Sequence, residues 1–132
     1  MKLEELQGLL RKKEADIEEL EFKNYQMRME LEEEFYQLQS KTRKIREMLE
    51  EKHNMARQFL FREEDAGEIT KELQHRLNRQ FESWTVVLDD SYNQAKLDLN
   101  RKQENLDAEF RQRFRELQAE VDDLNLQKRR LL

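Results

Sequence analysis

The side chains in this sequence that could take part in catalysis or metal binding are two histidines and two pairs of adjacent aspartates. His53 and His75 lie far apart, and there is no cysteine to join them as a metal ligand. The pairs Asp89-Asp90 and Asp122-Asp123 consist of neighbours, which do not lie on one face of a helix. We therefore expect surface histidines and solvated carboxylates, and we predict a non-enzymatic chain without catalytic, cofactor-binding or metal-binding residues.

The elements that carry these side chains are predicted to be helices. Of the 132 residues, 42% are charged and 36% hydrophobic, with two glycines and neither proline nor cysteine. This composition is typical of long helices and coiled coils, because a globular domain needs Gly or Pro for its turns. Apolar residues recur at regular spacing throughout, which argues against disorder.

The same composition limits location and partners. The absence of cysteine fits a reducing compartment, and no apolar run approaches the ~20 residues that span a bilayer. The net charge of −5 is spread over two halves that each mix acidic and basic residues. We expect a cytoplasmic protein with solvated helix faces and no membrane insertion, and we consider nucleic-acid binding unfavoured.

The first half follows a heptad repeat. With Leu3 at position a, most a and d positions up to Leu73 are apolar, which indicates the seam of a left-handed coiled coil. Asn24 occupies an a position, where asparagine fixes register at a cost in stability; simple tolerance of one polar residue explains it equally well. Lys13 and Glu34 at d positions weaken the seam, and a second chain with complementary charge would compensate Glu34.

The second half follows an eleven-residue repeat, which predicts a straight or slightly right-handed coil. Its two main apolar rows are Ala66, Leu77, Leu88, Leu99, Phe110, Val121 and Leu132, and then Leu73, Trp84, Ala95, Leu106 and Leu117. We interpret Trp84 as a core anchor. The chain therefore divides into a heptad segment (1–65) and an eleven-residue-repeat segment (66–132).

Gly67, near the middle of the chain, permits two arrangements. The sequence favours one long, mostly continuous helix with heptads over 3–73 and eleven-residue repeats over 66–132, because Ala66, Ile69 and Leu73 keep the heptad through the glycine. The alternative is a two-helix hairpin turning near 63–68. A hairpin would set a 3.5-residue seam against a 3.67-residue one, and the two are expected to drift apart.

Oligomerisation, most simply as a dimer with itself or a related coiled-coil chain, is predicted to use the apolar rows. The predicted oligomer core consists of Leu3, Leu6, Leu10, Ile17, Leu20, Asn24, Met27, Leu31, Leu38, Ile45, Met48, Phe59, Ala66, Leu73, Leu77, Phe81, Trp84, Leu88, Leu99, Leu106, Phe110, Leu117 and Val121.

Two further groups are candidate partner-binding residues. The first, opposite the heptad seam, is an apolar strip of Phe22, Tyr25, Met29 and Tyr36, which predicts the docking of another protein. The second is the basic cluster Lys41, Arg43, Lys44 and Arg46, which would suit the acidic surface of a polymer. Pairing of these cations with nearby glutamates on the helix is the simpler explanation.

Charged helical chains that mix both repeats with scattered Phe, Tyr and Trp resemble the long coiled coils of cytoskeletal, ciliary and kinetochore assemblies, and also membrane-tethering coiled coils. This resemblance rests on composition and repeat pattern over the whole chain and not on a sequence motif. It implies a structural scaffold or spacer that is cytoskeletal or microtubule-associated. The alternative is an adaptor or tethering coiled coil that presents a helical surface to a small GTPase or another globular partner.

Overall fold

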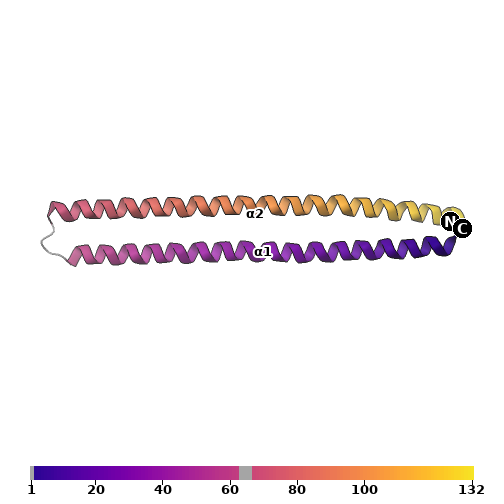
Figure 1. Ribbon diagram of the computed structural model, residues 1–132, viewed down its shortest axis with the longest axis horizontal. Coiled ribbons are helices and arrows are strands. Elements are labelled where there is room, and N and C mark those ends of the chain that lie inside the picture. Colours follow the sequence, from indigo (N-terminus) through magenta and orange to yellow (C-terminus); the bar gives the residue numbers. More distant parts are fainter. Residues whose placement is uncertain (1, 63–66) are drawn as a thin grey trace. The chain divides into compact units, whose positions relative to one another are not determined.

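Two long α-helices make up nearly all of the described chain. The computed structural model describes residues 2–62 and 67–132, in which α1 covers Leu3–Arg62 and α2 covers Glu68–Leu131 (Figure 1). The helices form because Glu, Lys, Arg, Leu and Gln are strong helix formers and no proline interrupts them. Acidic residues in the first turn of α1 and basic residues in the last turn of α2 complement the helix dipoles. The predicted all-α fold is confirmed.

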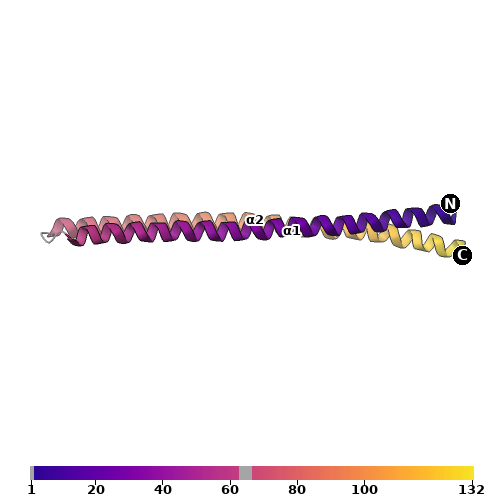
Figure 2. The same ribbon diagram turned by 90° about the horizontal axis from the view of Figure 1, so that it is seen from below.

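The chain forms two compact units, each built from part of α1 and an antiparallel part of α2. Unit 1 joins the residues up to Glu33 with Asn100–Leu132, and unit 2 is Glu34–Leu99. In unit 1, ion pairs join Lys13 to Glu120 at 2.7 Å and Arg28 to Asp107 at 2.9 Å. A step forward along α1 is thus a step backward along α2, which defines the antiparallel pairing. Figure 2 shows the helices of unit 1 inclined to one another, as expected for helices that pack at a small crossing angle.

The helical hairpin fits the structure, and the uninterrupted helix favoured by the sequence does not. Gly67 lies in a bend directly before α2, and its carbonyl accepts a hydrogen bond from the Lys71 N–H at 3.4 Å. Gly67 therefore occupies the cap position of α2, where glycine is well tolerated. The heptad position at Ala66 and most of the alternative turn near 63–68 lie outside the described residues.

The two repeats do not drift apart, because the contact surface of α1 does not stay on the heptad positions. In unit 1 it uses a and d residues such as Leu6, Leu10 and Ile17, but in unit 2 it uses Leu49, His53, Ala56 and Leu60. A straight helix has about 3.6 residues per turn and rotates by ~20° per heptad relative to a 3.5-residue repeat. The side of α1 that faces α2 follows the geometry of the helix and not the heptad pattern.

The most deeply buried side chains described all belong to unit 1. They are Leu6, Leu10 and Leu31 from α1 and Leu117 and Val121 from α2. In unit 2 the residues between the helices are half-buried, among them Phe35, Leu49, Leu77 and Phe81. Unit 2 therefore buries less of its apolar surface within the chain than unit 1 does.

Candidate protein interaction surface

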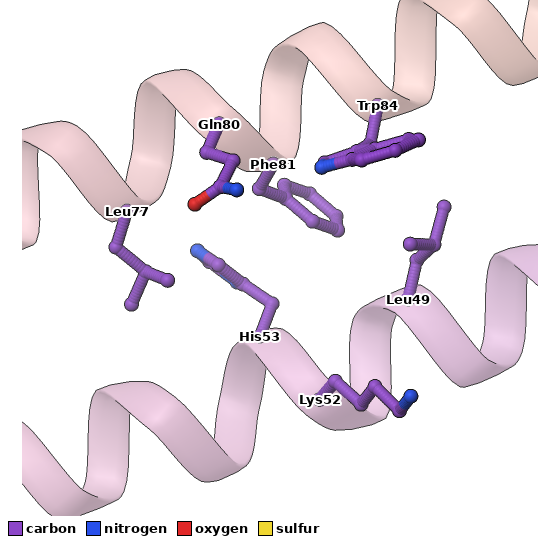
Figure 3. Close-up of a pocket in the computed structure, with 7 residues that line it drawn as sticks. All are labelled: Leu49, Lys52, His53, Leu77, Gln80, Phe81 and Trp84. Atoms are coloured by element: carbon purple, nitrogen blue, oxygen red, sulfur yellow. The ribbon is translucent and has the colours of Figure 1, made fainter.

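Unit 2 carries two neighbouring apolar grooves on one side of its helix pair. The first is lined by Leu49, Lys52, His53, Leu77, Gln80, Phe81 and Trp84 (Figure 3). The second is lined by Ala56, Phe59, Leu60, Leu73, Arg76, Leu77 and Gln80. Gln80 and Leu77 line both, so the two grooves form one continuous surface along α1 and α2.

The floor of the first groove is held by an aromatic stack between the helices. The imidazole of His53 lies against the ring of Phe81, with the centroids 4.2 Å apart and the planes inclined by 20°. His53 Nε2 is 3.0 Å from Asn78 Oδ1, and since this oxygen can only accept, the imidazole N–H donates. His53 is thus a half-buried residue that joins α1 to α2, a packing role that the sequence did not predict, whereas His75 is exposed as expected.

Large apolar side chains border these grooves without being covered by the chain. Phe59 and Lys52 line the grooves from α1, and Ile45, Met48 and Met55 share their side of the helix through the heptad spacing. On α2, Leu73 and Trp84 line the grooves, and Ile69 and Val87 lie one turn away on the same side. We name this surface the apolar face; it consists of Ile45, Met48, Met55, Phe59, Ile69, Leu73, Trp84 and Val87, all exposed.

The structure divides the predicted oligomer core into three groups. Residues buried or half-buried between α1 and α2 are Leu3, Leu6, Leu10, Ile17, Leu20, Asn24, Leu31, Leu38, Leu77, Phe81, Leu88, Leu99, Leu106, Phe110, Leu117 and Val121. Exposed residues are Met27, Ile45, Met48, Phe59, Leu73 and Trp84, and Ala66 lies outside the described residues. A role of any of them in oligomerisation stays a prediction.

Trp84 does not act as a core anchor between the two helices. Its side chain is 54% exposed, and Figure 3 shows it opposite Leu49 at the edge of the groove. The neighbouring Thr85 turns inward instead, and its hydroxyl donates to the Phe81 carbonyl at 2.9 Å. The eleven-residue spacing places Trp84 near the inward side of α2 but one position away from it.

Sequence reasoning missed several residues that pack between the helices of unit 2. Phe35, Thr42, Leu49, His53, Ala56 and Leu60 all lie on the inward side of α1 and are half-buried. The heptad frame places them at e and b positions, beside or away from the a and d seam. A 3.6-residue period drawn through Leu31 and Leu38 would have reached them.

The predicted partner strip lies on the outer surface of α1. Phe22 and Tyr25 are each 60% exposed, and Met29 is also exposed, all in unit 1. Tyr36, the fourth member, is exposed in unit 2. The exposure that docking requires is present, and the docking itself stays a prediction.

One of the four residues of the basic cluster forms an ion pair within the chain. Arg46 donates to Asp89 at 2.6 Å, which ties it to α2. Lys41, Arg43 and Lys44 lie exposed on the surface of α1 in unit 2. Three of the four predicted cations therefore remain accessible to an acidic surface.

One polar atom between the helices of unit 1 stands out. Asn24 is half-buried, and its Oδ1 is buried without a hydrogen-bond partner among the described residues. A buried oxygen without a partner costs stability. This cost accompanies the proposed role of Asn24 in fixing register, and no side chain in the described part of the chain offsets it.

Within residues 2–62 and 67–132, no group of three or more His, Asp or Glu side chains is placed to hold a metal ion. None of the described helices is long and apolar enough to cross a membrane. Comparisons with known protein families, with curated proteins and with solved structures find no match to this chain.

Proposed function

We propose that this chain is a non-enzymatic scaffold or spacer module that assembles with other proteins through the outer surfaces of its helix pair. The observation that carries this proposal is the amount of large apolar surface left exposed in both units, with Phe22 and Tyr25 in unit 1 and the apolar face in unit 2. Single exposed apolar residues are common on proteins. Rows of them at helical spacing are typical of surfaces that bind another helix or protein.

The proposed setting is a cytoskeletal or microtubule-linked assembly. The accessible cations Lys41, Arg43 and Lys44 support it, because an acidic filament would attract them. The test is co-sedimentation of the purified chain with microtubules and with actin filaments. A triple reversal to glutamate at these positions is expected to abolish sedimentation, whereas reversal of Arg129 and Arg130, two exposed cations of α2, is the control and is expected to retain it. If the chain sediments with neither microtubules nor actin filaments, the cytoskeletal setting is refuted.

A second candidate is an adaptor that presents its helices to a globular partner such as a small GTPase. The exposed strip of Phe22, Tyr25 and Met29 favours it, since aromatic side chains are enriched in the centres of protein interfaces. Binding of a purified small GTPase, lost on Tyr25→Glu or Met29→Glu while helicity by circular dichroism is unchanged, would favour the adaptor over the filament scaffold.

A further inference from the structure

The apolar face arises because the heptad pattern of α1 continues into unit 2, where the heptad positions no longer face α2. Ile45, Met48, Met55 and Phe59 continue the seven-residue spacing that begins at Leu3. A rotation of ~20° per heptad amounts to roughly a quarter turn over four to five heptads. By unit 2 the heptad row has therefore turned away from α2 and lies beside the groove, exposed.

This row has the spacing that packs against another helix, and no helix within residues 2–62 and 67–132 covers it. A 3.5-residue apolar repeat is the pattern of a coiled-coil seam. On α2, the apolar surface continues on the same side of the helix pair with Ile69, Leu73, Trp84 and Val87. The two grooves join the α1 and α2 residues into one surface. The face is two helices wide, which matches a second helix pair better than a single helix.

The area of the face agrees with what a stable dimer buries. Its eight side chains include Phe59, Met55, Ile69 and Trp84, which are 66%, 61%, 76% and 54% exposed. Together the eight leave on the order of 800 Å² accessible, about the area that each partner contributes to a standard-size protein interface. Covering the face with an equal surface would bury all eight without any change in the fold of unit 2.

The charges around the face are balanced, which favours a partner that also carries both signs. Arg76 at the edge of the second groove is paired with Glu72 at 2.9 Å. A strongly acidic or strongly basic partner would meet repulsion from half of these groups, whereas a second copy would supply both.

We propose that two copies of this chain pair through their apolar faces and form a four-helix bundle from their two unit 2 helix pairs. The contact is isologous, with the same surface used by both copies. This inference rests on the proposed assembly function and specifies the surface and the partner. Unit 1, with its more deeply buried residues, takes no part in the contact.

Mass measurement across a dilution series tests the inference with the full chain. Sedimentation equilibrium should give twice the chain mass of 16.4 kDa above about 10 μM and approach the single-chain mass on dilution. The single tryptophan is a second readout, because Trp84 leaves water on pairing. Its emission maximum should shift to shorter wavelength as concentration rises, in step with the mass.

Substitutions at the most exposed members of the face locate the contact. Met55→Glu and Ile69→Glu should each raise the dissociation constant at least 30-fold, about 2 kcal/mol, at unchanged helicity. Leu126→Glu, an equally drastic change at an exposed apolar residue of unit 1, should leave dimerisation intact. It serves as the matched control.

Three outcomes would overturn the inference. The chain could remain a monomer at every concentration with constant Trp84 emission. It could also dimerise equally well as Met55→Glu and Ile69→Glu, which would place the contact elsewhere. Loss of dimerisation in Leu126→Glu alone would place it on unit 1. A monomer that still binds filaments would refute the pairing and leave the proposed scaffold function standing.

Discussion

Asp89 of α2 accepts a hydrogen bond from the guanidinium of Arg46 of α1 at 2.6 Å, and this ion pair marks the register of the two helices in unit 2. The two side chains come from distant parts of the sequence and meet only because α1 and α2 pack antiparallel. Both are about half exposed, so the pair lies in water and contributes modestly.

A charge swap at this pair tests the register. Arg46→Asp and Asp89→Arg should each lower the free energy of unfolding by about 0.5–1 kcal/mol, because each places like charges together. The double variant should recover most of this loss, since it restores an ion pair with the roles exchanged. Urea unfolding followed by circular dichroism provides the measurement, and strictly additive losses would show that the two side chains are not in contact.

Truncation of the buried core should be costly. Leu117 is 1% exposed, so Leu117→Ala should lower the free energy of unfolding by about 2–4 kcal/mol through lost apolar contact and a residual cavity. Leu126→Ala, the same change at an exposed position of α2, is the control and should cost less than about 1 kcal/mol. Equal effects at both positions in urea unfolding would contradict the packing of unit 1.

Replacement of Asn24 by leucine should stabilise the chain. The substitution removes a buried oxygen that has no hydrogen-bond partner among the described residues and adds apolar contact, for a gain of about 1 kcal/mol. Asn105→Leu, at an exposed position of α2, should give almost no gain. A loss of stability in Asn24→Leu, measured by urea unfolding, would mean that the amide is hydrogen-bonded in the folded protein.

The ion pair between Lys13 and Glu120 predicts a pH-dependent contribution to the stability of unit 1. The hydrogen bond from Lys13 Nζ at 2.7 Å, aided by the charges of Lys13 and Arg113, lowers the pKa of Glu120 below its ordinary 4.5. Because the pKa is lowered by folding, the stabilisation is present above pH 4.5 and is lost as the pH falls through the folded-state pKa. The advantage of the wild type over Glu120→Gln should therefore shrink between about pH 6 and pH 3.

Thermal unfolding at several pH values in low salt measures this difference, and it should also narrow as salt is added. Glu104→Gln, an exposed glutamate elsewhere in unit 1, is the matched control for loss of one negative charge. A wild-type advantage over Glu120→Gln that stays constant across the whole pH range would refute the contribution of this ion pair.

The all-α fold and the inward side of α2 were predictable from the sequence. Leu77, Leu88, Leu99, Phe110 and Val121 repeat every eleven residues, and this period is close enough to that of a straight helix to stay on one side of it. The same residues are buried or half-buried in the structure. Local helix propensity and apolar period, both readable from one sequence, decided these features.

The hairpin and the inward side of α1 in unit 2 could not be read from the same pattern. Ile45, Met48 and Phe59 follow the heptad, yet they are exposed, whereas His53 and Ala56 pack against α2. Periodicity shows that a surface is apolar but not which helix covers it. The choice between a continuous helix and a hairpin depends on contacts between distant residues, such as Arg46 with Asp89, which leave no local signal.

The candidate interaction surface was therefore predicted only in part. The strip of Phe22, Tyr25 and Met29 followed from its spacing and is exposed as expected. Five of the eight residues of the apolar face were assigned to a coiled-coil core, because the sequence alone does not reveal which side of α1 faces α2; these are Ile45, Met48, Phe59, Leu73 and Trp84. Its members became a candidate surface only once the grooves of unit 2 were known.

The whole account rests on the hairpin. Its most direct test is the distance, within one molecule, between facing positions of the two helices of unit 1. Since the chain has no cysteine, spin labels at Lys12→Cys and Ala119→Cys report on residues adjacent to the Lys13–Glu120 ion pair. Doubly labelled chain is diluted into unlabelled chain, so that only distances within one molecule are seen. Electron–electron double resonance should then give a distance below roughly 30 Å, because packed helices lie ~10 Å apart. No distance in this range, as expected when a continuous helix separates the labels by about 160 Å, would contradict the hairpin.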